Sequence, residues 1–148
     1  MAIKFLKRSL FQRLLGIPVT TKPLDPGCWT YSDGKVTIDL KRASELQKPG
    51  GAIRLEGANL PERLLVVFCE DGRYRAFHNR CTHVGHRRLD PVPGTNTVQC
   101  CSVSKSTYNF EGNKIYGPNP KPIRTYLTDT EGDRLIVTII GPEESTAL

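Results

Sequence analysis

Residues 81–86 read Cys-Thr-His-Val-Gly-His, and two adjacent cysteines, Cys100 and Cys101, follow later in the chain. Cys81 and His83 stand two positions apart directly after a predicted strand, so a loop there can turn both side chains toward one metal centre. The paired cysteines come seventeen and eighteen positions after His83, at the end of another predicted strand. Thiolate and imidazole are ligands that suit zinc, mononuclear iron and iron–sulfur centres. We therefore expect two loops at one end of a β body to meet around a metal.

The segments around this cysteine and histidine cluster alternate between apolar and polar residues, which is typical of β-strands. Strands are predicted at residues 35–40, 52–55, 63–70, 73–78, 97–100, 106–110, 114–116, 123–128 and 134–140. One helical turn is expected at 43–47, and Asp71-Gly72 is the best hairpin signal. Many short strands with frequent turns predict an all-β fold of small antiparallel sheets, either a sandwich or a partly open barrel.

The chain divides into three regions. Residues 1–34 are expected to form a short basic amphipathic helix at 2–17 and then a Pro/Gly-rich loop at 18–34. Residues 35–140 form one β domain, and residues 141–148 form a loose tail. The predicted helix has two interpretations: it packs on the body of the protein, or it contacts an anionic membrane surface or an acidic partner.

Composition excludes several classes of protein. No apolar run reaches the roughly 18 residues that a membrane helix needs. The net charge of +6 favours an acidic partner. Basic residues are scattered rather than interleaved with aromatic residues, so no nucleic acid partner is expected. Five cysteines, an odd number, argue against a disulfide framework. With no recognisable signal peptide, they predict a reducing, cytoplasmic setting, in which Cys28 and Cys69 are buried as small hydrophobic residues.

The stretch from Leu65 to Tyr126 resembles the Rieske-type iron–sulfur domain. An Asp-Gly hairpin, then Cys81-Thr82-His83-Val84-Gly85 as the first cluster box, and finally Gly117-Pro118-Asn119-Pro120 carry the resemblance, which extends over about residues 35–140. It implies a Rieske-like fold with a cluster-binding tip and a [2Fe–2S] cluster. Pro118 and Pro120 would belong to the loop that covers the cluster.

The second cluster box departs from the family pattern, which reads Cys-Pro-x-His-Gly-Ser-x-Tyr/Phe-Asp/Asn. Residues 101–109 read Cys-Ser-Val-Ser-Lys-Ser-Thr-Tyr-Asn. Ser104 therefore stands where the family has its second iron-binding histidine, and Lys105 stands where it has glycine. Ser106 and Tyr108 match the serine and tyrosine that, in the family, hydrogen-bond a bridging sulfide and a cysteine sulfur. An ordinary Rieske centre uses two cysteines and two histidines, so the resemblance implies an altered centre.

Three side chains could replace the missing imidazole, and we rank them in the order Cys100, His86, Ser104. Cys100 would give a set of three cysteines and one histidine, whereas His86 would restore a second imidazole. Ser104 would have to bind as an alkoxide, which requires strong activation by the metal. The expected ligand set is thus Cys81, His83 and Cys101 with one of these three.

The resemblance implies a small one-electron carrier, a Rieske-like ferredoxin that exchanges electrons with a partner protein. Arg87 and Arg88 follow the first box; they are either solvated or stabilise the reduced form of the centre and attract an acidic partner. Two alternatives remain open. One is a cluster-free module of the same fold that binds or regulates, similar to the small subunit of assimilatory nitrite reductase.

The other alternative is a mononuclear zinc or iron structural site. Its ligands would be Cys81, His83, Cys100 and Cys101. The sequence contains no phosphate loop, nucleophile elbow or His-Glu helix of a hydrolase. Any part in catalysis is therefore expected to be that of an electron-transfer component of an oxidoreductase system.

Overall fold

The computed structural model describes residues 5, 12, 19–81, 88–101, 105–117 and 121–139. The described strands are β1 (Trp29–Ser32), β2 (Lys35–Asp39), β3 (Ala52–Leu55), β4 (Leu64–Phe68), β5 (Tyr74–His78), β6 (Leu89–Pro91), β7 (Thr97–Cys100), β8 (Thr107–Asn109), β9 (Lys114–Tyr116), β10 (Thr125–Glu131) and β11 (Arg134–Thr138). Two short 3-10 helices, η1 (Pro26–Cys28) and η2 (Ser44–Leu46), precede β1 and β3. The predicted all-β architecture is confirmed.

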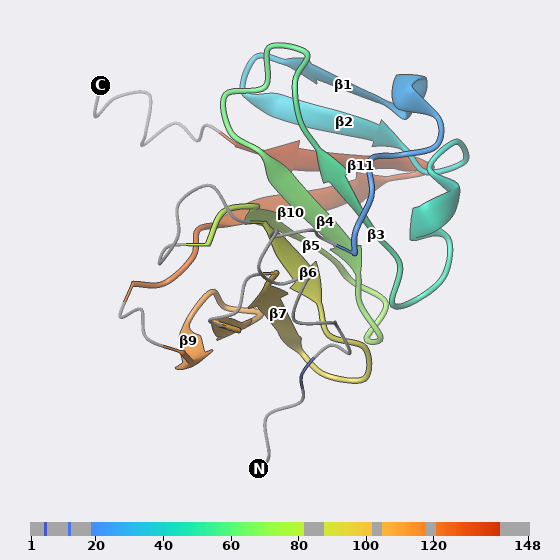
Figure 1. Ribbon diagram of the computed structural model, residues 1–148. Coiled ribbons are helices and arrows are strands. Elements are labelled where there is room, and N and C mark those ends of the chain that lie inside the picture. The colour runs from blue at the N-terminus through green and yellow to red at the C-terminus, as the bar shows by residue number, and fades with distance from the viewer. Residues whose placement is uncertain are drawn as a thin grey trace.

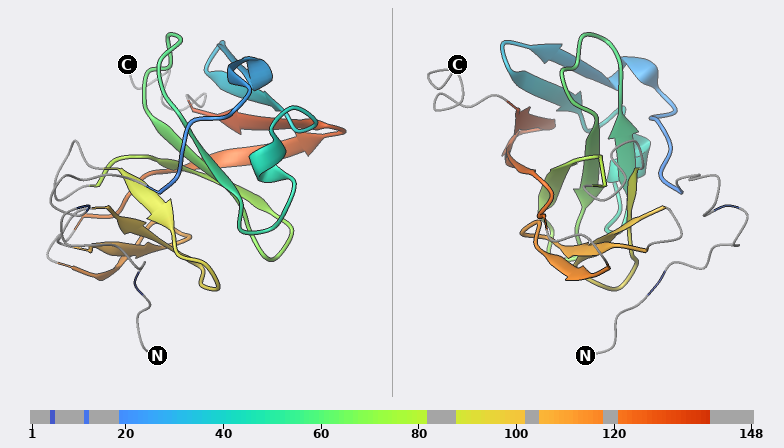
Figure 2. Two further views of the ribbon diagram at one scale, coloured as in Figure 1. Left: turned by 45° about the vertical axis from the view of Figure 1, so that its right-hand side comes forward. Right: turned by 60° about the vertical axis from the view of Figure 1, so that its left-hand side comes forward.

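The strands form two antiparallel sheets. A seven-stranded sheet has the order β1-β2-β11-β10-β5-β4-β3, and a four-stranded sheet has the order β6-β7-β8-β9. Figures 1 and 2 show the smaller sheet, in yellow to orange, lying below the larger one. All four of its strands lie in the chain between β5 and β10, which pair with each other through Phe77↔Thr125 and Ala76↔Tyr126. The smaller sheet is therefore an insertion whose two ends are held together by the larger sheet.

Strand β4 explains how two hydrophobic cores arise from one short sequence. Its side chains point alternately to opposite faces. Leu64 and Val66 join a core with β2, β3 and β11, whereas Leu65 and Val67 join a second core with β5 to β8. Because both faces of β4 are covered, its sequence is a continuous apolar run rather than an alternating one.

The prediction of a loop at 18–34 is wrong for the part of the segment that forms η1 and β1. Ser32 pairs with Lys35 across a two-residue turn. Asp33 and Gly34 in that turn have φ of 54° and 77°, the left-handed conformation that tight hairpin turns require. The sheet thus begins before residue 35, and a second Asp-Gly signal marks the place.

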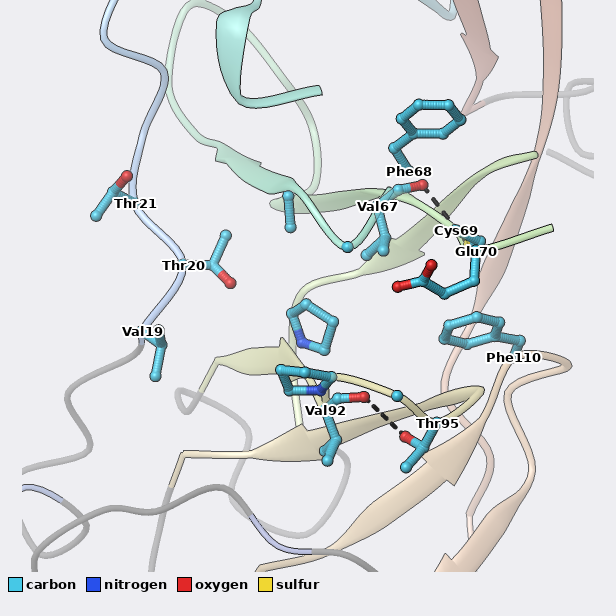
Figure 3. A pocket seen from close by; sticks show the side chains of 15 residues that line it. Val19, Thr20, Thr21, Val67, Phe68, Cys69, Glu70, Val92, Thr95 and Phe110 are labelled. Carbon is cyan, nitrogen blue, oxygen red and sulfur yellow. Dashed lines mark hydrogen bonds between the residues drawn. The ribbon is translucent and has the colours of Figure 1, made fainter. Parts of the chain in front are cut away.

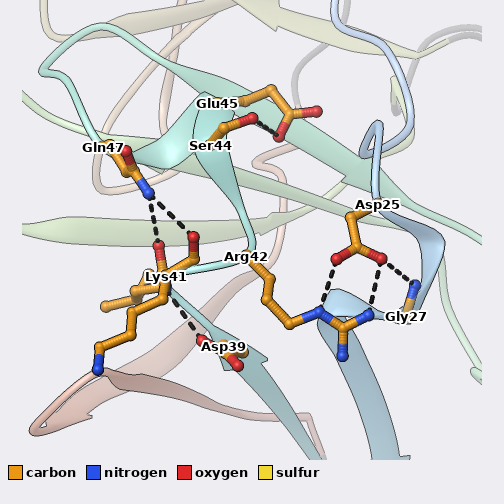
Figure 4. Close-up of polar contacts among 9 residues, drawn as sticks. Asp25, Gly27, Asp39, Lys41, Arg42, Ser44, Glu45 and Gln47 are labelled. Atoms are coloured by element: carbon orange, nitrogen blue, oxygen red, sulfur yellow. Dashed lines mark hydrogen bonds and ion pairs between the residues drawn. The ribbon is translucent and has the colours of Figure 1, made fainter.

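The segment before β1 is joined by charged groups to Arg42, in the turn between β2 and η2 (Figure 4). Arg42 donates hydrogen bonds of 2.6 and 2.9 Å to the two carboxylate oxygens of Asp25. Asp25 also accepts from the backbone N–H of Gly27 at 3.0 Å. The predicted amphipathic helix at 2–17 lies outside the described residues, apart from positions 5 and 12. No helix in the described ranges is long and apolar enough to span a membrane.

Candidate metal centre

The segment that contains the first box joins β5 of the larger sheet to β6 of the smaller one, and the second box begins after β7, beside the start of β6. Cys81 follows β5, and the chain enters β6 at Leu89, which pairs with Cys100 at the end of β7. One residue further along, the N–H of Cys101 donates to the carbonyl oxygen of Arg88 at 3.0 Å. The chain shortly after the first box is therefore hydrogen-bonded to the first residue of the second box.

Two further residues lie at this end of the smaller sheet: Ser106, just before β8, and Gly117, just after β9. The N–H of Cys100 donates to the carbonyl oxygen of Ser106 at 2.8 Å. Gly117, which follows β9, has a φ of +108°, and a Cβ placed on it would lie 2.6 Å from the hydroxyl oxygen of Ser106. Only glycine permits this approach. The segment that leads into the predicted proline loop therefore starts against the buried Ser106.

The predicted site residues divide into two groups. Cys81, Cys100, Cys101, Ser106 and Tyr108 are described, and all five are buried. The rest of the predicted set lies in ranges outside the described residues, namely His83, His86, Ser104, Pro118 and Pro120. These ranges directly follow Cys81, Cys101 and Gly117, which all lie at this end of the smaller sheet. The metal ligands themselves stay a prediction.

Tyr108 and Cys81 meet in the second hydrophobic core. The phenol oxygen of Tyr108 lies 3.7 Å from the sulfur of Cys81, and either atom can be the donor. The two side chains belong to the same buried cluster as Leu65, Phe77 and Leu89. In such apolar surroundings a thiolate needs a hydrogen-bond donor, and the hydroxyl of Tyr108 is placed to supply one.

The two adjacent cysteines have different surroundings. Cys100 belongs to the buried cluster that contains Cys81 and Tyr108. Cys101 is hydrogen-bonded through its N–H to the carbonyl oxygen of Arg88, and, as a minor contribution, its charge acts to raise the pKa of both Arg63 and Arg88. The pKa of Arg63 is lowered mainly by burial and next by the like charge of Arg88, while Glu56 and Cys101 act in the opposite direction. A thiolate at 101 would therefore lie beside positive charge, whereas one at 100 would be surrounded by apolar side chains.

An acidic residue completes these surroundings. Arg88 donates to both carboxylate oxygens of Glu56, at 2.6 and 2.9 Å, and Arg54 donates to one of them at 2.8 Å. The pKa of Glu56 is lowered to about 2, first by the hydrogen bond from Arg88. Sequence reasoning missed Glu56, because no motif marks a carboxylate whose partner stands 32 positions away.

The described donors suit an anionic metal centre. They comprise three buried thiols with a phenol hydroxyl and two guanidinium groups near them. Within the described ranges alone, no three His, Cys, Asp or Glu side chains converge to hold a metal ion. The imidazoles that would complete a set belong to residues 82–87.

A separate cavity of about 250 Å³ lies at the opposite end of the smaller sheet (Figure 3). It is lined by the arm at 19–21, by Val67 to Glu70 and by the β6–β7 turn, with Phe110 beside them. Among the predicted ligands, none of the described ones lines this cavity. The cavity and the candidate metal centre are therefore distinct.

Comparisons with known proteins place this geometry in context. A family model described as the Rieske [2Fe-2S] domain matches residues 37–127, more than half of the chain. The ferredoxin of carbazole 1,9a-dioxygenase from Nocardioides aromaticivorans IC177 is 19% identical, with a TM-score of 0.52 over 62% of this chain and 86% of that one. No curated protein matches the sequence.

Two further solved structures are similar. A chain from the complex of reduced oxygenase and oxidized ferredoxin in carbazole 1,9a-dioxygenase is 18% identical, with a TM-score of 0.56, over 72% of this chain and 94% of that one. The quaternary ammonium Rieske monooxygenase CntA is 18% identical, with a TM-score of 0.52, over 75% of this chain but only 31% of its own. At these identities the neighbours show a shared fold.

Proposed function

Since the chain belongs to the Rieske [2Fe-2S] domain family, we propose that it is a small one-electron carrier of the ferredoxin type with an atypical ligand set. The observation that supports this most directly is that Cys81, Arg88 and Cys101, described residues in or near the two boxes, lie at one end of the smaller sheet. There Cys81 contacts Tyr108, and Cys101 is hydrogen-bonded to Arg88. The ferredoxin-type neighbours, which share the fold, agree with this role.

Each residue has a role in this proposal. A [2Fe–2S] cluster supplies one-electron chemistry when it is bound. Cys81 and Cys101 offer thiolates and His83 an imidazole, with Cys100, His86 or Ser104 as the fourth ligand. The position of Cys100 in the same buried cluster as Cys81 supports ranking it first. Ser106 and Tyr108 would supply hydrogen bonds to sulfur, and Pro118 and Pro120 would shield the site from water.

The decisive experiment is anaerobic purification followed by iron, sulfide and zinc analysis, with visible absorption and electron paramagnetic resonance (EPR) spectra. We expect about two irons and two sulfides per chain, which is the composition of a [2Fe–2S] centre. A colourless protein without iron or zinc would identify the cluster-free alternative, and zinc or iron without sulfide would identify the mononuclear one. Variants C100A and H86A then assign the fourth ligand, because only the true ligand changes the spectrum.

The altered ligand set predicts a low reduction potential. A thiolate in place of a neutral imidazole adds negative charge to the centre, which disfavours reduction. It also leaves one titrating imidazole rather than two. Potentiometry from pH 6 to pH 10 measures both properties. A high potential that responds to two ligand ionisations would contradict a three-cysteine centre and indicate His86.

We further propose that the redox partner is acidic. The chain has a net charge of +6, and opposite charges accelerate encounter between proteins. One neighbour was solved as a complex of oxygenase and ferredoxin, so an oxygenase is a reasonable partner to test. The rate of electron transfer should fall as salt rises from about 50 to 300 mM, because screening weakens long-range attraction. A rate that rises with salt would argue for a basic partner.

A further inference from the structure

Arg88 is held at both ends in the described structure. Its guanidinium makes a two-pronged contact with Glu56, and its carbonyl oxygen accepts the N–H of Cys101. The side chain of Glu56 is only 14% exposed and that of Arg88 28% exposed. Ion pairs that are two-pronged and partly shielded hold their geometry better than single surface pairs. Arg88 is thus a fixed point rather than a solvated cation.

The contact between Glu56 and Arg88 connects the larger sheet to the part of the chain that lies between the two boxes. Arg88 lies three positions after Gly85, the last residue of the first box, and its carbonyl oxygen accepts the N–H of Cys101, the first residue of the second box. Glu56 follows β3, in the larger sheet. The pKa of Arg88 is raised chiefly by its hydrogen bonds to Glu56, and the charge of Cys101 contributes in the same direction. The guanidinium therefore lies within electrostatic range of that sulfur.

We propose that Glu56 is a positioning residue for electron transfer. By binding Arg88 it fixes the chain just after the first box against the start of the second box, and it keeps a positive charge beside Cys101. That charge stabilises the reduced form of the centre, so it raises the reduction potential. This inference rests on the proposed function, since it assumes a metal centre that includes Cys101.

The direction in which the reduction potential changes in E56Q distinguishes a positioning role of Glu56 from an effect of its charge alone. Removing the carboxylate of Glu56 deletes a negative charge, which by itself would make reduction easier. If Glu56 acts by holding Arg88, its removal frees the guanidinium into solvent and makes reduction harder. A potential that falls in E56Q therefore cannot come from the lost charge alone.

The test is potentiometric titration of the iron-loaded protein with dithionite, following the EPR signal, for the wild type, E56Q, R88Q and R54Q. One electron passes from dithionite to the centre, and no bond is made or broken in the protein. We expect R88Q to lower the equilibrium constant for reduction about tenfold, which is about 59 mV for a one-electron couple. E56Q should shift it in the same direction by about threefold or more.

R54Q is the matched control, because it removes the other cation bound to Glu56 and leaves the Glu56–Arg88 contact in place. In R54Q the equilibrium constant for reduction should change less than twofold. Hydrogen exchange at the N–H of Cys101 gives a second readout, and it should be faster in E56Q than in R54Q. If E56Q does not load iron, R88K carries the test, since lysine keeps the charge but not the two-pronged contact.

The outcomes are distinguishable. A wild type that binds no iron overturns the proposed function and this inference with it. An iron-loaded wild type whose potential rises or does not move in E56Q, or in R88K where that variant is needed, overturns this inference alone. A fall in E56Q and R88Q with little change in R54Q supports it.

Discussion

Lys105 has a backbone conformation that ordinarily favours glycine. It stands where the family pattern has glycine, and its φ is +54°. A residue other than glycine in this left-handed region costs roughly 1–2 kcal/mol. The ammonium group of Lys105 lies 5.3 Å from the centre of the Phe5 ring, a cation–π contact that offsets part of this cost. The change at 105 therefore keeps the turn that leads into Ser106.

Gly117, beside the candidate metal centre, is a position where a single added methyl group should be damaging. In G117A the new Cβ would meet Ser106 at 2.6–2.7 Å with a φ of +108°, so both backbone strain and overpacking apply. We expect a loss of about 2–4 kcal/mol in the free energy of unfolding. G72A is the control: its φ is +82° but nothing lies within 4 Å of the added Cβ. Urea unfolding that ranks the two variants equally would contradict the packing argument.

Tyr108→Phe isolates the hydroxyl that faces Cys81 at 3.7 Å. The ring stays in the core, so packing is kept, and about 1 kcal/mol of stability should be lost with the hydrogen bond. In the iron-loaded protein the potential should fall, because the sulfur loses a donor that stabilises added negative charge. Urea unfolding and potentiometry measure the two effects. An unchanged potential would mean that the hydroxyl does not face a ligand sulfur.

At the scale of elements, a single buried carboxylate connects the arm at 19–21 to the smaller sheet. Asp90 in β6 accepts the N–H groups of Val19 and Thr20 at 2.9 and 2.8 Å. The N–H of Arg54, in β3, donates to the carbonyl oxygen of Thr21 at 3.0 Å. The arm is therefore attached to both sheets and closes one side of the cavity in Figure 3.

Asp90→Ala should release this arm. Two backbone N–H groups lose a charged acceptor, and hydrogen bonds to charged groups contribute about 1.5–3 kcal/mol each, so we expect a total loss of about 3–6 kcal/mol in the free energy of unfolding. Limited proteolysis should cut near residue 20 sooner, and urea unfolding should shift to lower concentration. D25A, which breaks an exposed pair nearer η2, should leave the cut near residue 20 unchanged. Equal proteolysis of the wild type and D90A would contradict the attachment.

For the whole molecule, Glu56 predicts an acid-sensitive component of stability. Its pKa is lowered from 4.5 to about 2 by Arg88 and Arg54. A carboxyl group whose pKa is lower in the folded state stabilises it above pH 4.5, and this contribution disappears as the pH falls toward 2. Allowing for screening by solvent, it amounts to about 1–2 kcal/mol. The gap in unfolding free energy between wild type and E56Q should therefore be larger at pH 6 than at pH 3.

The opposite trend, a gap that widens on acidification, would show that Glu56 is not ionised in its contact with Arg88. Urea unfolding of both proteins in the same buffers at each pH makes this comparison. R54Q again serves as a control, since it leaves the stronger of the two ion pairs intact.

Local pattern predicted most of the strands but not the contacts between distant segments. The apolar run of β4 and the alternation in β2 and β11 identified strands because burial of one or both faces sets the side-chain period. The short β6 was missed, and β1 was assigned to a loop despite its Asp33-Gly34 turn. Glu56–Arg88 and Asp90–Thr20 join residues 32 and 70 positions apart. No periodicity encodes such pairs.

The pairing of β5 with β10 has a consequence for how this chain could have diverged. The larger sheet is continuous across the base of the insertion, because Phe77 pairs with Thr125 and Ala76 with Tyr126. None of the inserted strands contributes a backbone pairing to it. Substitutions of ligand residues in the two boxes can then accumulate without breaking the pairing of β5 with β10. A serine at position 104 in place of a histidine therefore alters the ligands available to a metal and leaves the strand pairing of the larger sheet untouched.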